Sequence, residues 1–260
     1  QNFNPGLGFL HSPFVGLKYF RQLMALPNIN NVFFNTIFIA AAKIFFGTVS
    51  AIVLSLMLNE VRRTGYRRVI QTVVYMPYFL SWVILGSIFT SMLSSDGMIN
   101  NLIVAMGGQP IFFLGDNGWF RFILILTDVW KGVGFGTVVY LAAITAIDPT
   151  LYEAAVMDGA GRIRQTWHVT IPGMMPIIVL MAMLNLGNLM NAGFDQIFNM
   201  YNTLVMDSSD IIDTLVYRLG MVSAKFSLAT AVGLLKSVIT MILMSVSYFL
   251  AYKFADYRVF

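Results

Sequence analysis

The chain has 260 residues, of which 58% are hydrophobic and 11% charged, and its formal net charge is +4. A soluble domain ordinarily carries about 25% charged residues, so this composition excludes the usual soluble enzymes and nucleic-acid-binding proteins. The chain contains no cysteine, which excludes disulfides, thiol catalysis and thiolate-bound metals. His11 and His168 lie far apart in the sequence, so no histidine metal site is expected.

Five segments are long and apolar enough to cross a membrane as helices, which takes about 20 residues. They are residues 32–58, 69–93, 119–146, 173–192 and 227–252. Strands of a membrane barrel would be about ten residues long with alternating polarity, whereas these runs are longer and apolar on all faces. The sequence therefore predicts an all-α polytopic membrane protein with five transmembrane helices, and a transmembrane domain over 32–252.

The distribution of Lys and Arg predicts which loops face the cytoplasm. The loops at 59–68 and 147–172 are basic, and Lys and Arg also occur in the tail at 253–260. The loop at 94–118 has no Lys or Arg, and aspartates outnumber basic residues in 193–226. We therefore expect the basic loops and the C-terminus to be cytoplasmic.

The first segment, residues 1–31, is then extracytoplasmic, because an odd number of spans separates it from the tail. The sequence starts at Gln1 and shows no signal peptide. An external N-terminus requires a preceding membrane segment, so we expect an upstream helix and at least six spans in the parent protein.

The cytoplasmic loop at 147–172 has the pattern of a helix, a glycine break and a second helix. Asp148 and Pro149 predict a helix start, and Gly159 and Gly161 predict an interruption. The loop is long for a simple connection, so it either docks a partner protein or only turns the chain around.

A second amphipathic stretch is expected through Ile163 and Trp167, with Pro172 closing the loop before the fourth span. Two small residues, Ala154 and Ala155, would allow another protein to approach the first helix closely.

The loop resembles the EAA motif of bacterial ABC-importer permeases, which reads Glu-Ala-Ala, three residues, Gly, nine residues, and Ile-x-Leu-Pro. The matching positions are Glu153, Ala154, Ala155, Gly159, Val169, Ile171 and Pro172. Val169 and Ile171 replace the Ile and Leu of the motif. The whole chain is similar to maltose-permease-type carbohydrate importers, and segments 185–202 and 210–218 look most like permeases for complex oligosaccharides, including alginate.

This resemblance implies the fold of a type I ABC importer permease in the bacterial cytoplasmic (inner) membrane, and a role in oligosaccharide import. It also implies that the loop is a coupling helix gripped by an ATP-binding subunit. The coupling residues would be Glu153, Ala154, Ala155, Asp158, Gly159 and Pro172. Glu153 would pair with a basic residue of that subunit, and Gly159 would permit the turn.

The implied partners are a second homologous permease and two ATP-binding subunits, which together make a heterotetramer, and an extracytoplasmic solute-binding protein. ATP and Mg would be bound by the partner subunits, because this chain lacks the G-x-x-x-x-G-K-[ST] loop. We expect no catalytic residue, metal or cofactor in the chain itself, and contacts with membrane lipid but not nucleic acid. The loops 94–118 and 193–226 would either dock the binding protein or pack against the partner permease.

Ionisable residues within spans are functional candidates because they are costly in hydrocarbon. Lys43, Asp128, Lys131 and Lys236 all fall near the expected midplane. Asp128 and Lys131 could pair along one helix, which leaves Lys43 and Lys236 without an obvious acidic partner. This spare positive charge favours an acidic sugar such as a uronate oligomer, unless the lysines bond to carbonyls or to carboxylates of a partner.

The substrate path needs groups that hydrogen-bond and stack with sugars. The candidates are Lys43, Asp128, Trp130, Lys131, Tyr140, Asn185, Asn188 and Lys236. Asn185, Asn188 and Asn191 fall at three-residue steps on the expected fourth span, where they would either line the path or join helices. The glycines of Gly132–Gly136 are expected to serve close helix packing.

Two other classes compete with the importer permease. An intramembrane enzyme would need a nucleophile and base at matching depth, and His168 lies in the loop rather than near Asp128. An ion-coupled secondary transporter would favour internal repeats, and the sequence shows no convincing repeat.

Overall fold

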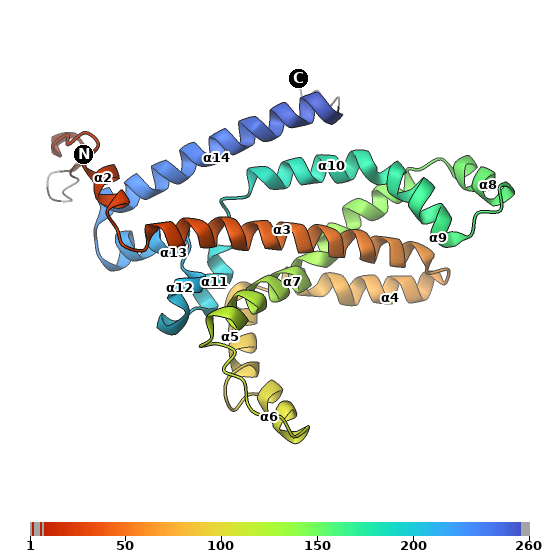
Figure 1. Ribbon diagram of the computed structural model, residues 1–260, viewed down its shortest axis with the longest axis horizontal. Coiled ribbons are helices and arrows are strands. Elements are labelled where there is room, and N and C mark those ends of the chain that lie inside the picture. Colours follow the sequence, from red (N-terminus) through yellow and green to blue (C-terminus); the bar gives the residue numbers. More distant parts are fainter. Residues whose placement is uncertain (1, 3–5, 7, 256–260) are drawn as a thin grey trace. The chain divides into compact units, whose positions relative to one another are not determined.

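The computed structural model describes residues 2, 6 and 8–255, and every regular element in these residues is helical. Figure 1 follows the chain from α2 to α14. The elements are α1 (Gly8–His11), α2 (Lys18–Met24), α3 (Ile29–Glu60), α4 (Thr64–Tyr75), η1 (Met76–Phe79), α5 (Trp82–Met92), α6 (Met98–Ala105), α7 (Asn117–Thr145), α8 (Pro149–Met157), α9 (Arg162–Gln165), η2 (Thr166–Thr170), α10 (Ile171–Gly187), α11 (Phe194–Met200), η3 (Thr203–Val205), α12 (Met206–Ser209), α13 (Ile212–Tyr217), η4 (Arg218–Val222) and α14 (Phe226–Ala255). The predicted all-α class is confirmed.

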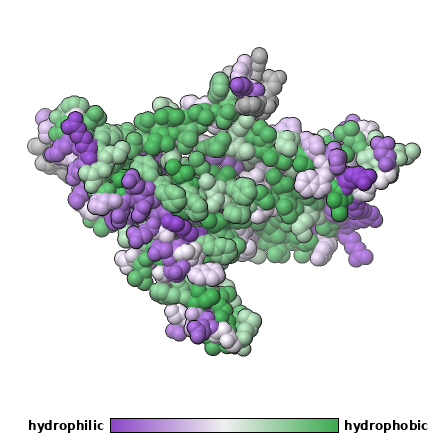
Figure 2. Space-filling model, in the orientation of Figure 1, coloured by the Kyte–Doolittle hydropathy of each residue, from purple (hydrophilic) through white to green (hydrophobic). Residues whose placement is uncertain are grey.

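Four helices in the described residues are long and apolar enough to cross a membrane: Ile29–Glu60, Asn117–Thr145, Arg162–Gly187 and Phe226–Leu250. A fifth span results if the broken pair Thr64–Phe79 and Trp82–Met92 is counted as one. Hydrophobic residues accordingly cover most of the long helices on the face shown in Figure 2. The helices expected at 32–58, 119–146 and 227–252 are therefore present.

The second expected span, 69–93, is not one continuous helix. It divides into α4, η1 and α5, with Leu80 in an extended conformation at φ −82° and ψ 140°. Pro77 lies in η1 and lacks the N–H that would continue the helical ladder. Ser81 then starts α5 by accepting a hydrogen bond from the N–H of Ile84.

The fourth span begins earlier and ends earlier than expected. Its helix runs from Arg162 to Gly187 through the π-helical turn η2. Pro172 does not close the loop, because it lies in the first turn of α10. The turn before it is π-helical, and the N–H of Ile171 donates to the carbonyl of Thr166 five residues earlier.

The described residues divide into two compact units. Unit 1 comprises the ranges 1–41, 81–125 and 188–243, and unit 2 comprises 42–80, 126–187 and 244–260. Residues 256–260, which include the end of the expected cytoplasmic tail, lie outside the described residues.

Unit 1 has two hydrophobic clusters. One contains Ile39, Phe120, Leu124, Ile197, Val205 and Ile211, and the other contains Leu23, Ile29, Ile212, Leu228 and Val232. Residues from the segment 193–226 contribute to both clusters. This segment was expected either to dock the binding protein or to pack against the partner permease, but a large part of it is buried within unit 1 itself. Only parts such as Leu204, Met221 and Val222 are exposed.

Unit 2 is built around residues of α3, α7 and α10, including Leu58, Tyr140, Ile144 and Met174. The glycines of α7 allow close packing, as the sequence predicted. A Cβ atom on Gly134 would lie 2.4 Å from the carbonyl oxygen of Val74, and one on Gly136 would lie 3.0 Å from Cβ of Ala51. Gly132 faces open space, so it does not share this role.

Candidate functional site

The loop between α7 and α10, in unit 2, contains a helix with defined ends. At the start of α8, the Asp148 carboxylate accepts a hydrogen bond of 2.9 Å from the N–H of Thr150, and Pro149 occupies the first turn. This backbone hydrogen bond favours the charged carboxylate and lowers the pKa of Asp148 below its ordinary value. The helix start predicted at Asp148-Pro149 is confirmed.

The end of α8 depends on Gly159, which has φ +75°. The N–H of Ala160 donates to the carbonyl of Ala155 at 2.8 Å, and the N–H of Gly159 donates to Val156 at 3.0 Å. This pair of bonds is a Schellman motif, in which the left-handed position strongly favours glycine. Gly161, with φ −70°, begins α9 and has no such requirement.

The surface of α8 is open. No residue of this helix is buried. Glu153 and Ala154 are exposed, whereas Ala155 is half-buried. Apolar side chains lie beside them, since Val156 is 59% and Met157 is 86% exposed. A small, partly apolar surface with one carboxylate is suited to contact with another protein.

Two polar contacts fasten this loop to long helices of unit 2. The hydroxyl groups of Tyr152 and Thr170 lie 3.0 Å apart, which ties α8 to η2. Arg162 forms an ion pair with Glu60 at the end of α3. A force applied to α8 therefore has direct routes into the Arg162–Gly187 helix and into α3.

The intramembrane charges of unit 2 pair differently from the sequence prediction. Lys43 of α3, which is 8% exposed, has its ammonium 3.4 Å from the carboxylate of Asp128 on α7. Asp128 was expected to pair with Lys131, its neighbour on the same helix. The packing of α3 against α7 instead brings Lys43 to Asp128, and one-dimensional spacing cannot show such a contact.

Lys131 lies beside an aromatic pair. Its ammonium donates to the carbonyl oxygen of Tyr78 at 2.9 Å and sits 5.2 Å from the centroid of that ring. Tyr78 stacks on Phe135, with ring centroids 4.6 Å apart and planes 9° from parallel. Both rings are partly exposed, at 40% for Tyr78 and 54% for Phe135. The sequence prediction identified Lys131 but missed both rings.

Lys236, in unit 1, also has an acidic partner. Its ammonium lies 2.5 Å from the carboxylate of Asp213 on α13 and 3.5 Å from the side-chain oxygen of Asn191. The expectation that Lys43 and Lys236 carry spare positive charge was therefore wrong. Asp213 was overlooked because it lies in a segment that sequence reasoning placed outside the membrane.

The remaining candidates for the substrate path differ in burial and in the elements that carry them. Tyr140 is 2% exposed and belongs to the core of unit 2, whereas Trp130 is 46% exposed. Asn185 lies in α10, but Asn188 and Asn191 follow the end of that helix. The three asparagines therefore do not share a helix face, because the helix ends at Gly187.

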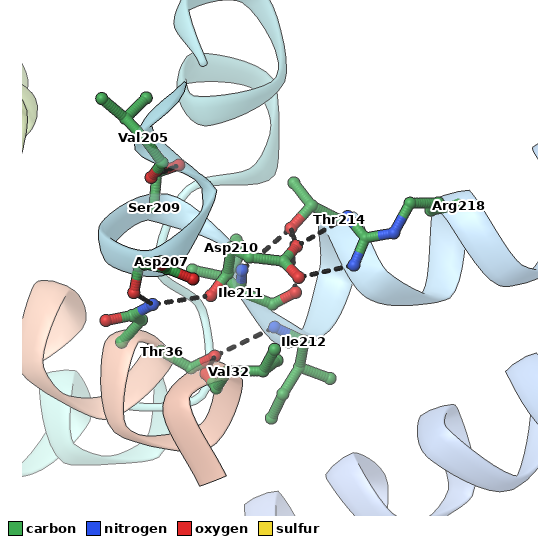
Figure 3. A network of polar contacts seen from close by, with 11 residues as sticks. Val32, Thr36, Val205, Asp207, Ser209, Asp210, Ile211, Ile212, Thr214 and Arg218 are labelled. Carbon is green, nitrogen blue, oxygen red and sulfur yellow. Dashed lines mark hydrogen bonds and ion pairs between the residues drawn. The ribbon is translucent and has the colours of Figure 1, made fainter. Parts of the chain in front are cut away.

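Sequence reasoning missed a buried polar network in unit 1 (Figure 3). The Asp210 carboxylate accepts two hydrogen bonds from Arg218, at 3.1 and 2.5 Å, and one of 2.7 Å from the hydroxyl of Thr214. The side chain of Asn35 donates to the carbonyl of Asp210 at 3.2 Å and accepts from Arg121 at 2.7 Å. In the sequence, the four-residue spacing of Asp210, Thr214 and Arg218 could have indicated that these side chains meet on one helix face.

This network joins segments that are distant in sequence. Arg121 also donates to the carbonyl of Ser208 at 3.1 Å, and Thr36 accepts from the N–H of Ile212 at 3.0 Å. Its members are satisfied by one another and many are buried, so its role is to hold α3, α7 and the segment from α12 to η4 together within unit 1.

The helical fold, the apolar spans and the exposed loop helix are the features of a polytopic transport protein. Within the described residues, no group of three or more His, Cys, Asp or Glu side chains could hold a metal ion. Residues 43–260 match the model of the family described as "Binding-protein-dependent transport system inner membrane component". The chain belongs to this family and is a multi-pass transport permease.

Two curated relatives come from Bacillus subtilis (strain 168). Protein LplB is 40% identical over 255 residues, which cover 98% of this chain and 80% of the relative. The polygalacturonan/rhamnogalacturonan transport system permease protein YteP is 42% identical over 257 residues, with the same two coverages.

A solved structure gives the same fold at 34% identity. It is a bacterial alginate ABC transporter in complex with an alginate pentasaccharide-bound periplasmic protein, and the match has a TM-score of 0.90. The match covers 94% of this chain and 85% of the other. The predicted ABC importer permease fold is confirmed.

Proposed function

We propose that this chain is one of two permease subunits of an ATP-driven importer of oligosaccharides, and that α8 couples it to an ATP-binding subunit. The observation that carries the coupling role is the geometry of α8. This helix buries no residue, ends at a glycine with φ +75°, and is tied to two long helices. It is thus available to a partner and connected to the spans.

In this role, Glu153 pairs with a basic residue of the ATP-binding subunit, and Ala154 permits close approach. Gly159 keeps the turn after α8 short. Asp158 ends α8, and Pro172 lies in the first turn of α10. ATP and Mg act in the partner subunits. The arginines of 59–68 and 147–172 favour a cytoplasmic position for both loops and for the C-terminus.

The partners are a homologous permease, two ATP-binding subunits and an extracytoplasmic binding protein that delivers the sugar. The family description names binding-protein dependence, and the alginate transporter was solved with such a periplasmic protein. In this chain, the exposed parts of the loops around α6 and η4 are the available extracytoplasmic docking surface.

The substrate is an acidic oligosaccharide. The support comes from YteP, named for polygalacturonan and rhamnogalacturonan, and from the alginate transporter. Polygalacturonan and alginate are polymers of uronic acids. In this chain, a cation beside two stacked rings, Lys131 with Tyr78 and Phe135, suits a sugar that carries a carboxylate. The rings pack on the apolar face of the sugar and the ammonium meets the carboxylate.

ATPase activity of the reconstituted complex tests the function. The binding protein would be loaded in turn with uronate and neutral oligosaccharides. Stimulation by a uronate oligosaccharide supports the proposal, stimulation by neutral sugars alone contradicts the acidic substrate, and no ATPase association contradicts the importer.

The role of Lys131 needs a separate variant. In Lys131→Met, we expect uptake of uronate oligosaccharides to fall at least about tenfold more than uptake of neutral ones, as for loss of one desolvated charge interaction. Lys18→Met, an exposed lysine of α2, is the matched control. Equal losses for both sugars would remove Lys131 from charge recognition.

A further inference from the structure

The helix α4, in unit 2, has an apolar stripe that no part of its own unit covers. None of its residues is buried. Four apolar side chains point outward from α4 and the start of η1, with exposures of 63% for Tyr66, 60% for Val69, 59% for Val73 and 58% for Met76. They follow one another at three- and four-residue steps, so they lie on a single helix face.

Arginines surround the first turn of this helix. Arg62 and Arg63 precede α4, and Arg67 and Arg68 lie near the start of this helix. In the described part of the chain, none of these four arginines forms an ion pair. The Arg162–Glu60 ion pair places the start of α9 near the same turn, and Figure 1 shows this turn between α3 and α4.

We propose that this arginine end and apolar stripe of α4 form a binding site for an anionic phospholipid of the cytoplasmic leaflet. An apolar face with basic residues at one end has the pattern of a helix that lies against acyl chains and attracts acidic headgroups. Guanidinium groups bind phosphate through paired hydrogen bonds. Tyr66, at the same end, lies where aromatic residues favour the headgroup level.

Two features favour lipid over a protein partner. The apolar stripe begins beside the arginines and continues into η1. A lipid could therefore place its headgroup at the arginines and its acyl chains along the stripe. The chain is an inner-membrane component by family, and the arginines at one end of the stripe complement an acidic headgroup whose acyl chains would contact the stripe. The proposal rests on the cytoplasmic position proposed above for the 59–68 loop, and not on the transported sugar.

The first test identifies what covers the stripe. The chain has no cysteine, so Val73→Cys provides a single site for a nitroxide label in a complex with cysteine-free partner subunits. We expect relaxation by oxygen and protection from a water-soluble nickel chelate, as for a lipid-facing site. Protection from both reagents would show that a partner protein covers the stripe, and this would overturn the proposal.

The second test measures the headgroup preference. The whole complex would be purified from nanodiscs that contain phosphatidylcholine and phosphatidylglycerol, and its retained lipids counted by native mass spectrometry. We expect phosphatidylglycerol to be retained selectively. Replacing Arg63, Arg67 and Arg68 with Gln should weaken this retention by roughly fivefold per arginine.

The matched control replaces the same three arginines with Lys, which keeps the charge and the orientation signal and should keep most of the retention. Arg21→Gln, on α2, is a control for general charge loss. Equal retention of phosphatidylglycerol by the wild type and the Gln variant would contradict the proposal, whatever the transport activity of the complex.

Discussion

Two polar regions of this chain look alike in sequence and differ in the folded protein. The segment 203–218 and the loop 148–161 both contain short helices with acidic, small and apolar residues. In the first, Asp210 and Thr214 are buried and bonded to one another. In the second, α8 buries no residue. Polar residues in the first region hold the fold together, and those in the second remain available to a partner.

The difference follows from the contacts that each segment makes with the rest of its own unit. Segment 203–218 receives donors from other parts of unit 1, such as Asn35 and Arg121, so its carboxylate and carbonyl groups are satisfied internally. The loop around α8 makes only a few contacts, at Tyr152 and Arg162. Substitutions should therefore affect stability in the first region and coupling in the second.

The largest effect on stability is expected from Asp210→Ala. This change leaves the partly buried Arg218 without its carboxylate partner and removes one of two acceptors of the Thr214 hydroxyl, at a cost of about 2–4 kcal/mol. Denaturant unfolding in detergent micelles would measure it. Asp207→Ala is the matched control, because the Asp207 side chain is exposed and only its carbonyl accepts from Asn35. Similar losses in both variants would contradict the stabilising role of the network.

Gly134→Ala should be next in size. The added Cβ would meet the backbone of Val74, which cannot move without shifting α4, and overpacking of this kind costs about 1–3 kcal/mol. Gly132→Ala, two residues earlier in α7, meets open space and should be neutral or slightly stabilising. Thermal unfolding of both variants would measure this difference, and equal stability of the two would contradict the close packing of α7 at Gly134.

Gly159→Ala should cost about 1 kcal/mol, because φ +75° is strained for any residue with a Cβ. Gly161→Ala provides the control, since both glycines face open space and only Gly159 has positive φ. Hydrogen exchange of the α8 amides would locate the effect. If both variants exchange alike, the Schellman turn is not what ends α8.

The smallest effect is expected from Asp148. Its pKa is lowered in the folded chain by the hydrogen bond from Thr150. Its contribution to helix stability is therefore fully present above the ordinary Asp pKa and is lost as pH falls through the lowered value. Asp148→Ala should increase exchange at the first turn of α8 at neutral pH, whereas Asp148→Asn should keep the cap and remove the pH dependence. Unchanged exchange in Asp148→Ala would argue against the cap.

Hydrophobic runs and turn residues were sufficient to predict the helical class, most spans and the start of α8. They did not show the break at Leu80, because a proline in an apolar run signals a bend or an end without distinguishing them. The sequence also could not predict the acidic partners of Lys43 and Lys236, because Asp128 and Asp213 contact them only through the packing of separate helices. The Asp210 network was missed because its polar composition was interpreted as exposure.

Coupling through α8 is tested most directly by ATP-driven uptake in proteoliposomes with the Glu153→Lys and Gly159→Arg double variant. Arg21→Glu, which reverses an exposed charge on α2, is the control. We expect the double variant to insert and fold, to bind its ATP-binding subunit weakly, and to lose at least about tenfold in uptake, as for loss of charged contacts at an interface. Undiminished uptake by correctly inserted double variant would contradict the coupling role of α8.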